Sequence, residues 1–286
     1  IITSLVEHKA VIDCAKYLEE RGFDVTWLKP RVSGEIFVED VKQAIREDTI
    51  LISLMHVNNE TGAITDVYEI SKLTKEKDIL FHIDAAQSVG KLALDTQLLA
   101  ADMISVCAHK IYGPKGVGAL YVRREADFIL PAQIHGGGHE RGMRSGTLAT
   151  HQIAAMGEAF ELAGESREIE QSRIASLKAT FMERISGLSV VRVNGQFQQG
   201  VSGILNLSFS GLDGQILLSA LPGLAISSGS ACTSATMSPS HVLQSMGLSE
   251  EAALSSLRFS FGRYTTEEDV LVATDMLINA VTKMSA

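Results

Sequence analysis

The sequence predicts an α/β fold whose mostly parallel sheet carries helices on both faces. Short apolar runs alternate with helical patterns through the first half of the chain, which is typical of such a sheet. Several of these runs are apolar at nearly every position, as expected for strands that are buried on both sides. The runs end in polar side chains, and strand ends at one edge of a parallel sheet form the crevice where ligands bind.

Apolar patterns and the position of one glycine predict the helices and strands in the first half of the chain. Gly22 ends a first amphipathic helix at about Arg21, because glycine commonly follows a helix C-terminus. Two further helices are expected at residues 38–46 and 67–75. Strands are expected at residues 1–6, 25–28, 50–55, 79–83, 102–106 and 117–122.

The second half has a different texture. A long helical pattern covers residues 152–185, although glycines punctuate it. Beyond it we expect shorter elements, with strands at 190–193, 204–209 and 257–260 and helices at 213–220, 238–246 and 266–284. We therefore predict a large α/β domain at residues 1–165, which binds the ligand, and a smaller α/β domain at residues 166–286.

Composition and charge exclude several classes of protein. Of the 286 residues, 45% are hydrophobic and 21% are charged, which is typical of a globular protein and not of a disordered one. The net charge of -9 argues against nucleic acid as a partner, and no apolar run approaches the roughly 18 residues that span a bilayer. Three cysteines without paired spacing indicate free thiols in a reducing compartment, so we expect a cytoplasmic protein.

Lys110 is the first candidate for chemistry. It follows the apolar run at 102–106 and precedes a glycine- and proline-rich loop, so it lies where α/β folds bind ligands. A lysine in a dry pocket can form a Schiff base with a carbonyl group. A lone lysine is more often exposed, so its neighbours decide between the two interpretations.

Three successive strands of the predicted sheet end in reactive residues. Such a cluster could form a metal site, a nucleotide site or a pyridoxal phosphate site. A metal site is one option, since histidines and an aspartate are present, but their spacing matches no zinc pattern and leaves Lys110 without a role. A nucleotide site lacks a complete glycine fingerprint, and Gly136–Gly138 alone is weak evidence. Pyridoxal phosphate explains more, because it needs a lysine for a Schiff base and a carboxylate such as Asp84 for its ring nitrogen. The residues in question are His56, His82, Asp84, Gln87, His109 and Lys110.

Long motifs then indicate a family. The segments at 135–147 and 227–234 closely resemble cysteine desulfurases of the iron–sulfur-cluster and nitrogen-fixation branch of the class V aminotransferases. So do the segments at 7–11, 56–60 and 84–90. The resemblance covers essentially the whole chain. It implies a pyridoxal-phosphate-dependent transferase fold of the aspartate-aminotransferase type and a homodimer.

The resemblance assigns most of the cofactor contacts. Lys110 would hold pyridoxal phosphate covalently, Asp84 would pair with its ring nitrogen, and Gln87 would hydrogen-bond its ring hydroxyl. His8 would stack on the ring and take part in catalysis. The remaining contacts, which lie at the phosphate or beside the substrate, would come from Asn59, Cys107, His109 and Thr147, with Thr147 supplied by the partner subunit.

The resemblance also assigns the substrate, L-cysteine, and a nucleophile. Arg258, assisted by Asn59, would bind the substrate carboxylate, which suits a guanidinium fork. The thiolate of Cys232 would attack the substrate sulfur, giving L-alanine and a persulfide that is passed to an iron–sulfur scaffold protein or another sulfur acceptor. Cys232 lies among small polar residues, a setting that favours an exposed loop. For Cys14, on the first helix, we expect burial and inertness.

The sequence departs from the family in two places. Cys107 stands where these enzymes usually carry a serine, and a thiol is the weaker hydrogen-bond donor. Family members also carry a longer N-terminal segment with a glycine–threonine helix start that binds the phosphate, so we expect these 286 residues alone to bind the cofactor weakly. The rival functions are a selenocysteine lyase, an aminotransferase, which needs no thiol at 232, and a cofactor-free protein that only binds sulfur-transfer partners.

Overall fold

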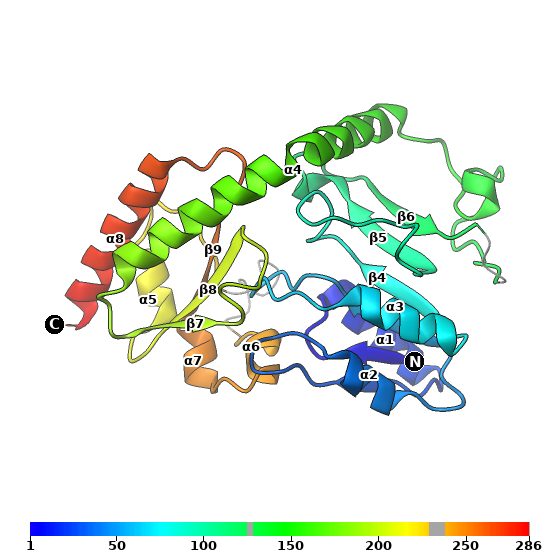
Figure 1. Ribbon diagram of the computed structural model, residues 1–286, viewed down its shortest axis with the longest axis horizontal. Coiled ribbons are helices and arrows are strands. Elements are labelled where there is room, and N and C mark those ends of the chain that lie inside the picture. Colours follow the sequence, from blue (N-terminus) through cyan, green and yellow to red (C-terminus); the bar gives the residue numbers. More distant parts are fainter. Residues whose placement is uncertain (125–127, 229–237, 286) are drawn as a thin grey trace.

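The computed structural model describes residues 1–124, 128–228 and 238–285 and contains two β-sheets (Figure 1). The larger sheet has six strands in the order β2-β1-β3-β4-β5-β6. All neighbours in it pair in parallel except β5 and β6, which are antiparallel. Its strands are β1 (Ile2–Ser4), β2 (Thr26–Leu28), β3 (Leu51–Met55), β4 (Leu80–Asp84), β5 (Met103–Cys107) and β6 (Gly118–Val122). The predicted mostly parallel sheet is confirmed.

The strand register brings the polar strand ends together. Asp84, the last residue of β4, lies opposite Met55 on β3 and Ser105 on β5. Directly after β5, the short 3-10 helix η1 (Ala108–Lys110) places Lys110 at the same edge of the sheet. The residues that follow β3, β4 and β5 therefore share one edge, as expected for parallel strands.

Helices of the first half pack against this sheet. They are α1 (Lys9–Glu20), α2 (Val38–Ala44) and α3 (Val67–Glu76). The side chains of His8 and Asp66 each accept a backbone N–H at the start of α1 and α3, which satisfies donors that a helix end leaves unpaired. Val41 of α2 and Ile70 of α3 join the buried core of the sheet, formed with Ile52 and Phe81.

The second sheet is antiparallel and has its own core. It consists of β7 (Val191–Asn194), β8 (Ile204–Phe209) and β9 (Ser256–Ser260), in that order. Helices α5 (Gly214–Ser219) and α8 (Glu267–Ser285) flank it. Phe181, Phe209 and Phe259 are the large aromatic side chains at the centre of its core.

A single helix, α4 (Thr150–Ile185), runs past both sheets (Figure 1). Its 36 residues continue through Gly157 and Gly164, two of the glycines in the predicted helical pattern, so the predicted long helix is confirmed. Ala159 and Ala163 pack against Ile111, just after η1, whereas Ile174 and Phe181 lie in the core of the second sheet. The helix therefore contacts both parts of the fold.

The chain returns to the first core after the second sheet has begun. Helix α6 (His241–Ser245) contributes Val242 and Leu243 to the core of the larger sheet, and α7 (Glu250–Leu254), which the sequence did not predict, contributes Ala253. A division at residue 165 falls within α4 and stays a prediction. A further 3-10 helix is η2 (Glu140–Gly142), and no helix in the described ranges is long and apolar enough to cross a bilayer.

Candidate active site

A cavity of about 1110 Å³ lies at the shared edge of β3, β4 and β5 and reaches the second sheet. Its lining contains most of the side chains that the sequence singled out. From the first half of the chain these are His8, Asn59, Asp84, Gln87, Cys107, His109 and Lys110, and from β9 it is Arg258. Segments that are far apart in the sequence thus meet around one space, which is large enough for a cofactor and a small substrate.

Asp84 and Gln87 stand at the end of β4. One carboxylate oxygen of Asp84 accepts the N–H of Ala86 at 2.9 Å, so the turn after the strand orients the side chain. Among the described residues that line the cavity, Asp84 is the only carboxylate. The amide oxygen of Gln87 accepts a hydrogen bond from Nζ of Lys91 at 2.8 Å.

His8 lies across the cavity from β4, at the start of α1. Its Nδ1 accepts the N–H of Ala10 at 3.2 Å, which fixes the ring against the helix. Burial, reinforced by the positive charge of Lys110, lowers the pKa of His8. The neutral imidazole is therefore favoured at pH 7, which is the form that can accept a proton.

Cys107 directly precedes the short helix that carries Lys110, and His109 lies within it. Cys107 is half-buried, and burial raises the pKa of its thiol, so the group is protonated at neutral pH. His109 is exposed on the cavity rim. Thr147 is exposed on the loop before α4 and is not among the cavity's lining residues. Cys232 lies outside the described residues.

Arg258 brings a cation from the second sheet to the cavity. One terminal nitrogen of its guanidinium donates to the backbone oxygen of Asn59 at 2.9 Å, whereas Nε is buried without a partner among the described residues. Burial lowers the pKa of Arg258, although Glu60 opposes that shift. Glu60 is itself buried and accepts the hydroxyl of Ser240 at 2.5 Å. A partly unsatisfied guanidinium at a cavity wall is suited to a carboxylate.

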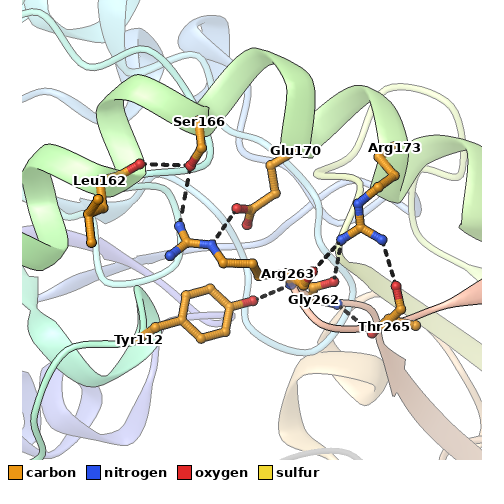
Figure 2. A network of polar contacts seen from close by, with 8 residues as sticks. All are labelled: Tyr112, Leu162, Ser166, Glu170, Arg173, Gly262, Arg263 and Thr265. Atoms are coloured by element: carbon orange, nitrogen blue, oxygen red, sulfur yellow. Dashed lines mark hydrogen bonds and ion pairs between the residues drawn. The ribbon is translucent and has the colours of Figure 1, made fainter.

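A polar network ties the loop after Lys110 to the loop after β9 (Figure 2). Arg263 donates its backbone N–H to the phenolic oxygen of Tyr112 at 2.5 Å and its guanidinium Nε to Glu170 of α4 at 2.7 Å. Arg173, also of α4, donates to the backbone oxygens of Gly262, Arg263 and Thr265. Helix α4 thus holds together the segments that carry Lys110 and Arg258.

Two lining residues differ from the sequence analysis. Lys91 was not among the predicted site residues but lines the cavity, and its position four residues after Gln87 was the available signal in the sequence. Cys14 was expected to be buried, and that expectation is wrong: it is exposed and lines the cavity, because it lies on the open side of α1.

The donor set fits pyridoxal phosphate better than a metal ion. No three His, Cys, Asp or Glu side chains gather as metal ligands among residues 1–124, 128–228 and 238–285. His82, one of the histidines weighed for a metal, is bonded to Ser53 and Ser105 instead. A lysine, a carboxylate, an amide and a neutral histidine around one cavity supply the functions that pyridoxal phosphate requires of a protein. The fold and the site together define a pyridoxal-phosphate enzyme.

Comparison with known proteins identifies the family. The chain belongs to the class-V aminotransferase family, whose model matches residues 1–272. It is 53% identical over 284 residues to the cysteine desulfurase IscS of Photobacterium profundum, and the match covers 99% of this chain and 70% of that protein.

Solved structures agree with this family. A NifS-like protein superposes with a TM-score of 0.88 at 32% identity, covering 99% of this chain and 74% of that one. A structure of SspA in complex with cysteine superposes with a TM-score of 0.79 at 38% identity, covering 93% and 74%. The predicted fold and cofactor are thereby confirmed.

Proposed function

We propose that the chain is a cysteine desulfurase, which takes sulfur from L-cysteine, releases L-alanine and passes the sulfur on for iron–sulfur cluster assembly. The observation that carries this proposal is the single cavity that joins Lys110, Asp84 and Gln87 to Arg258. The 53% sequence identity to an enzyme named cysteine desulfurase IscS supports the reaction. The structural similarity to SspA, which was solved in complex with cysteine, supports the substrate.

The cavity residues have separate tasks in this reaction. When bound, pyridoxal phosphate supplies an electron sink for bonds at the carbon atoms of the amino acid. Asp84 would hold a proton on the ring nitrogen, Gln87 would donate to the ring oxygen, and the neutral imidazole of His8 would pack against the ring. Lys110 would hold the cofactor before the substrate arrives and would then move a proton at the α-carbon.

Arg258 and Asn59 orient the substrate. Arg258 lines the cavity, and one terminal nitrogen of its guanidinium is fixed by the backbone oxygen of Asn59, so a carboxylate that enters the cavity meets a cation already held in place. Asn59 is buried beside it and accepts from Arg258 through its backbone oxygen. This pair directs the remainder of the amino acid toward Lys110.

Cys232 accepts the sulfur. Its thiolate forms an S–S bond with the substrate sulfur while the C–S bond breaks, and the electron pair of that bond stays with the carbon, which takes up a proton to give alanine. The described residues on both sides of Cys232 support this role. Ser227 pairs with the backbone of Arg258, and Ser240 donates to Glu60, so both flanks are attached close to the cavity.

The partners and the compartment are part of the proposal. Thr147 is exposed and outside the cavity of its own chain, so it serves the cofactor phosphate only if a second copy supplies it. We therefore infer a homodimer. The sulfur passes to an iron–sulfur scaffold protein or another sulfur acceptor. We propose the cytoplasm as the compartment, which three cysteines without paired spacing support.

The decisive experiment compares wild-type protein with Cys232→Ala and Cys107→Ala. With L-cysteine and a reductant, the wild type releases alanine and sulfide in equal amounts. Cys232→Ala keeps the visible band of the bound cofactor but releases neither product at an appreciable rate, because no nucleophile remains for the sulfur. Cys107→Ala retains turnover. Amino-group transfer to a 2-oxo acid without sulfide release would instead establish an aminotransferase.

A further inference from the structure

Lys91 occupies an unusual position for a lysine. It lies in the turns that follow β4, where Gly90 has a φ of 72° and lets the chain approach α4. A Cβ at Gly90 would come within 2.8 Å of Ile111 and 3.0 Å of Ala163, so only glycine permits this packing. The close approach brings the side chain of Lys91 to the wall of the cavity, beside Lys110.

The charge of Lys91 is not neutralised by a carboxylate at hydrogen-bond distance. None of the ion pairs within the described part of the chain includes Lys91. The groups that act on it are Lys110 on η1, Cys107 at the end of β5, Arg258 on β9 and Glu170 on α4. Burial, followed by repulsion from Lys110, lowers the pKa of Lys91 to about 8. Such a group costs free energy in a folded chain, which calls for a functional reason.

The hydrogen bond of Lys91 orients Gln87. A lysine ammonium only donates, so the partner at 2.8 Å must be the amide oxygen of Gln87. This contact fixes which way the amide faces. The NH₂ group of Gln87 is then left to donate to an acceptor within the cavity that Gln87 lines.

We propose that Lys91 is a positioning residue, which holds the amide of Gln87 so that its N–H donates to the ring oxygen of pyridoxal phosphate and which places a positive charge beside that oxygen. The inference rests on the cofactor placement of the proposed function. Lys91 acts through Gln87 and through its charge, and it does not bond to the cofactor itself.

The test is a titration of the protein loaded with pyridoxal phosphate, for the wild type and for Lys91→Met. Methionine fills similar space without a donor or a charge. The dissociation constant of the cofactor rises roughly 5-fold, because the Gln87 amide is no longer held. The pH midpoint of the visible cofactor band rises by roughly one unit, because a neighbouring cation no longer opposes protonation at Lys110.

Two further variants separate orientation from charge. Lys91→Arg keeps a donor and a charge and restores both values to near wild type. Lys91→Gln keeps a donor without a charge, so it retains cofactor affinity but shows the raised midpoint, and it replaces Lys91→Met if that variant does not fold. Lys115→Met, at an exposed lysine in the loop after η1, changes neither value.

The outcomes distinguish this inference from the proposed function. A visible band whose midpoint is the same in wild type, Lys91→Met and Lys91→Gln overturns the role of Lys91 and leaves the enzyme assignment intact. A wild-type protein that shows no cofactor band even at saturating pyridoxal phosphate overturns the proposed function and this inference with it. A raised midpoint in Lys91→Gln together with normal values in Lys91→Arg supports the inference.

Discussion

The phenolic oxygen of Tyr112 accepts the backbone N–H of Arg263 at 2.5 Å, and the Arg263 guanidinium lies 4.6 Å from the centre of the same ring (Figure 2). Tyr112 follows Lys110 by two residues, and Arg263 follows the strand of Arg258. This contact therefore helps to join the segment of Lys110, which is proposed to hold the cofactor, to the segment of Arg258, which is proposed to hold the substrate.

Replacing Tyr112 by phenylalanine tests this contact. The Arg263 N–H loses its acceptor while the ring remains, so we expect unfolding free energy to fall by about 1 kcal/mol. Because the segments carrying Lys110 and Arg258 are less firmly joined, the KM for L-cysteine rises several-fold and kcat changes less. Tyr264→Phe is the matched control, since Tyr264 is exposed and contacts Tyr112 only through its ring. Equal effects of the two variants on KM would contradict the role of the contact.

Lys110 is expected to carry the cofactor covalently. Borohydride reduction of the loaded protein fixes a pyridoxyl group on the peptide that contains Lys110, which mass spectrometry identifies. Lys110→Ala lowers turnover by about three orders of magnitude, because the proton-transfer group is lost, whereas Lys115→Ala has no effect. Finding the label on Lys91, which also lines the cavity, would show that Lys91 and not Lys110 holds the cofactor.

Cys107→Ser should strengthen cofactor binding. The half-buried thiol is a weak donor and is protonated at neutral pH because burial raises its pKa. A hydroxyl in the same place lowers the dissociation constant by roughly 3- to 5-fold, measured from the visible band at increasing cofactor concentration. Cys14→Ser, at the exposed cavity thiol, leaves the constant unchanged. An unaltered constant in Cys107→Ser would place the cofactor phosphate away from residue 107.

Glu7→Gln should change how stability depends on pH. The Glu7 carboxyl is fully buried, accepts from Ser4 and from the N–H of Met55 through one oxygen, and has its pKa raised to about 8 by burial. In the unfolded chain the group ionises near its ordinary pKa, so the wild type loses unfolding free energy as pH rises from about 5 to 8. Glutamine cannot ionise and is spared that loss, which amounts to roughly 3 to 5 kcal/mol.

Urea unfolding of both proteins at pH 5 and pH 8 checks this prediction. The stability of Glu7→Gln relative to wild type should rise between the two values. If the unfolding free energies of Glu7→Gln and wild type differ by the same amount at pH 5 and pH 8, Glu7 is ionised in the folded protein throughout this range.

The sequence predicted the strands of both sheets to within one or two residues, because apolar runs mark buried strands regardless of their partners. Helix α7 was missed, since its five residues are too few to show a helical period. Lys91 was not among the predicted site residues, and the expected burial of Cys14 was wrong. Their exposure depends on how Gly90 packs against α4 and on which side of α1 is covered, and neither contact is local in sequence.

Helices α4 and α6 link the unfolding of the two sheets. α4 is anchored in the core of the smaller sheet and against Ile111, while α6, from beyond α4, completes the core of the larger sheet. Unfolding of either core exposes apolar side chains of the other. Calorimetry should therefore record one cooperative unfolding transition for the two sheets. A fragment that ends at residue 165 would lack Val242, Leu243 and Met246, which belong to the core of the larger sheet. It would expose an apolar surface that promotes aggregation.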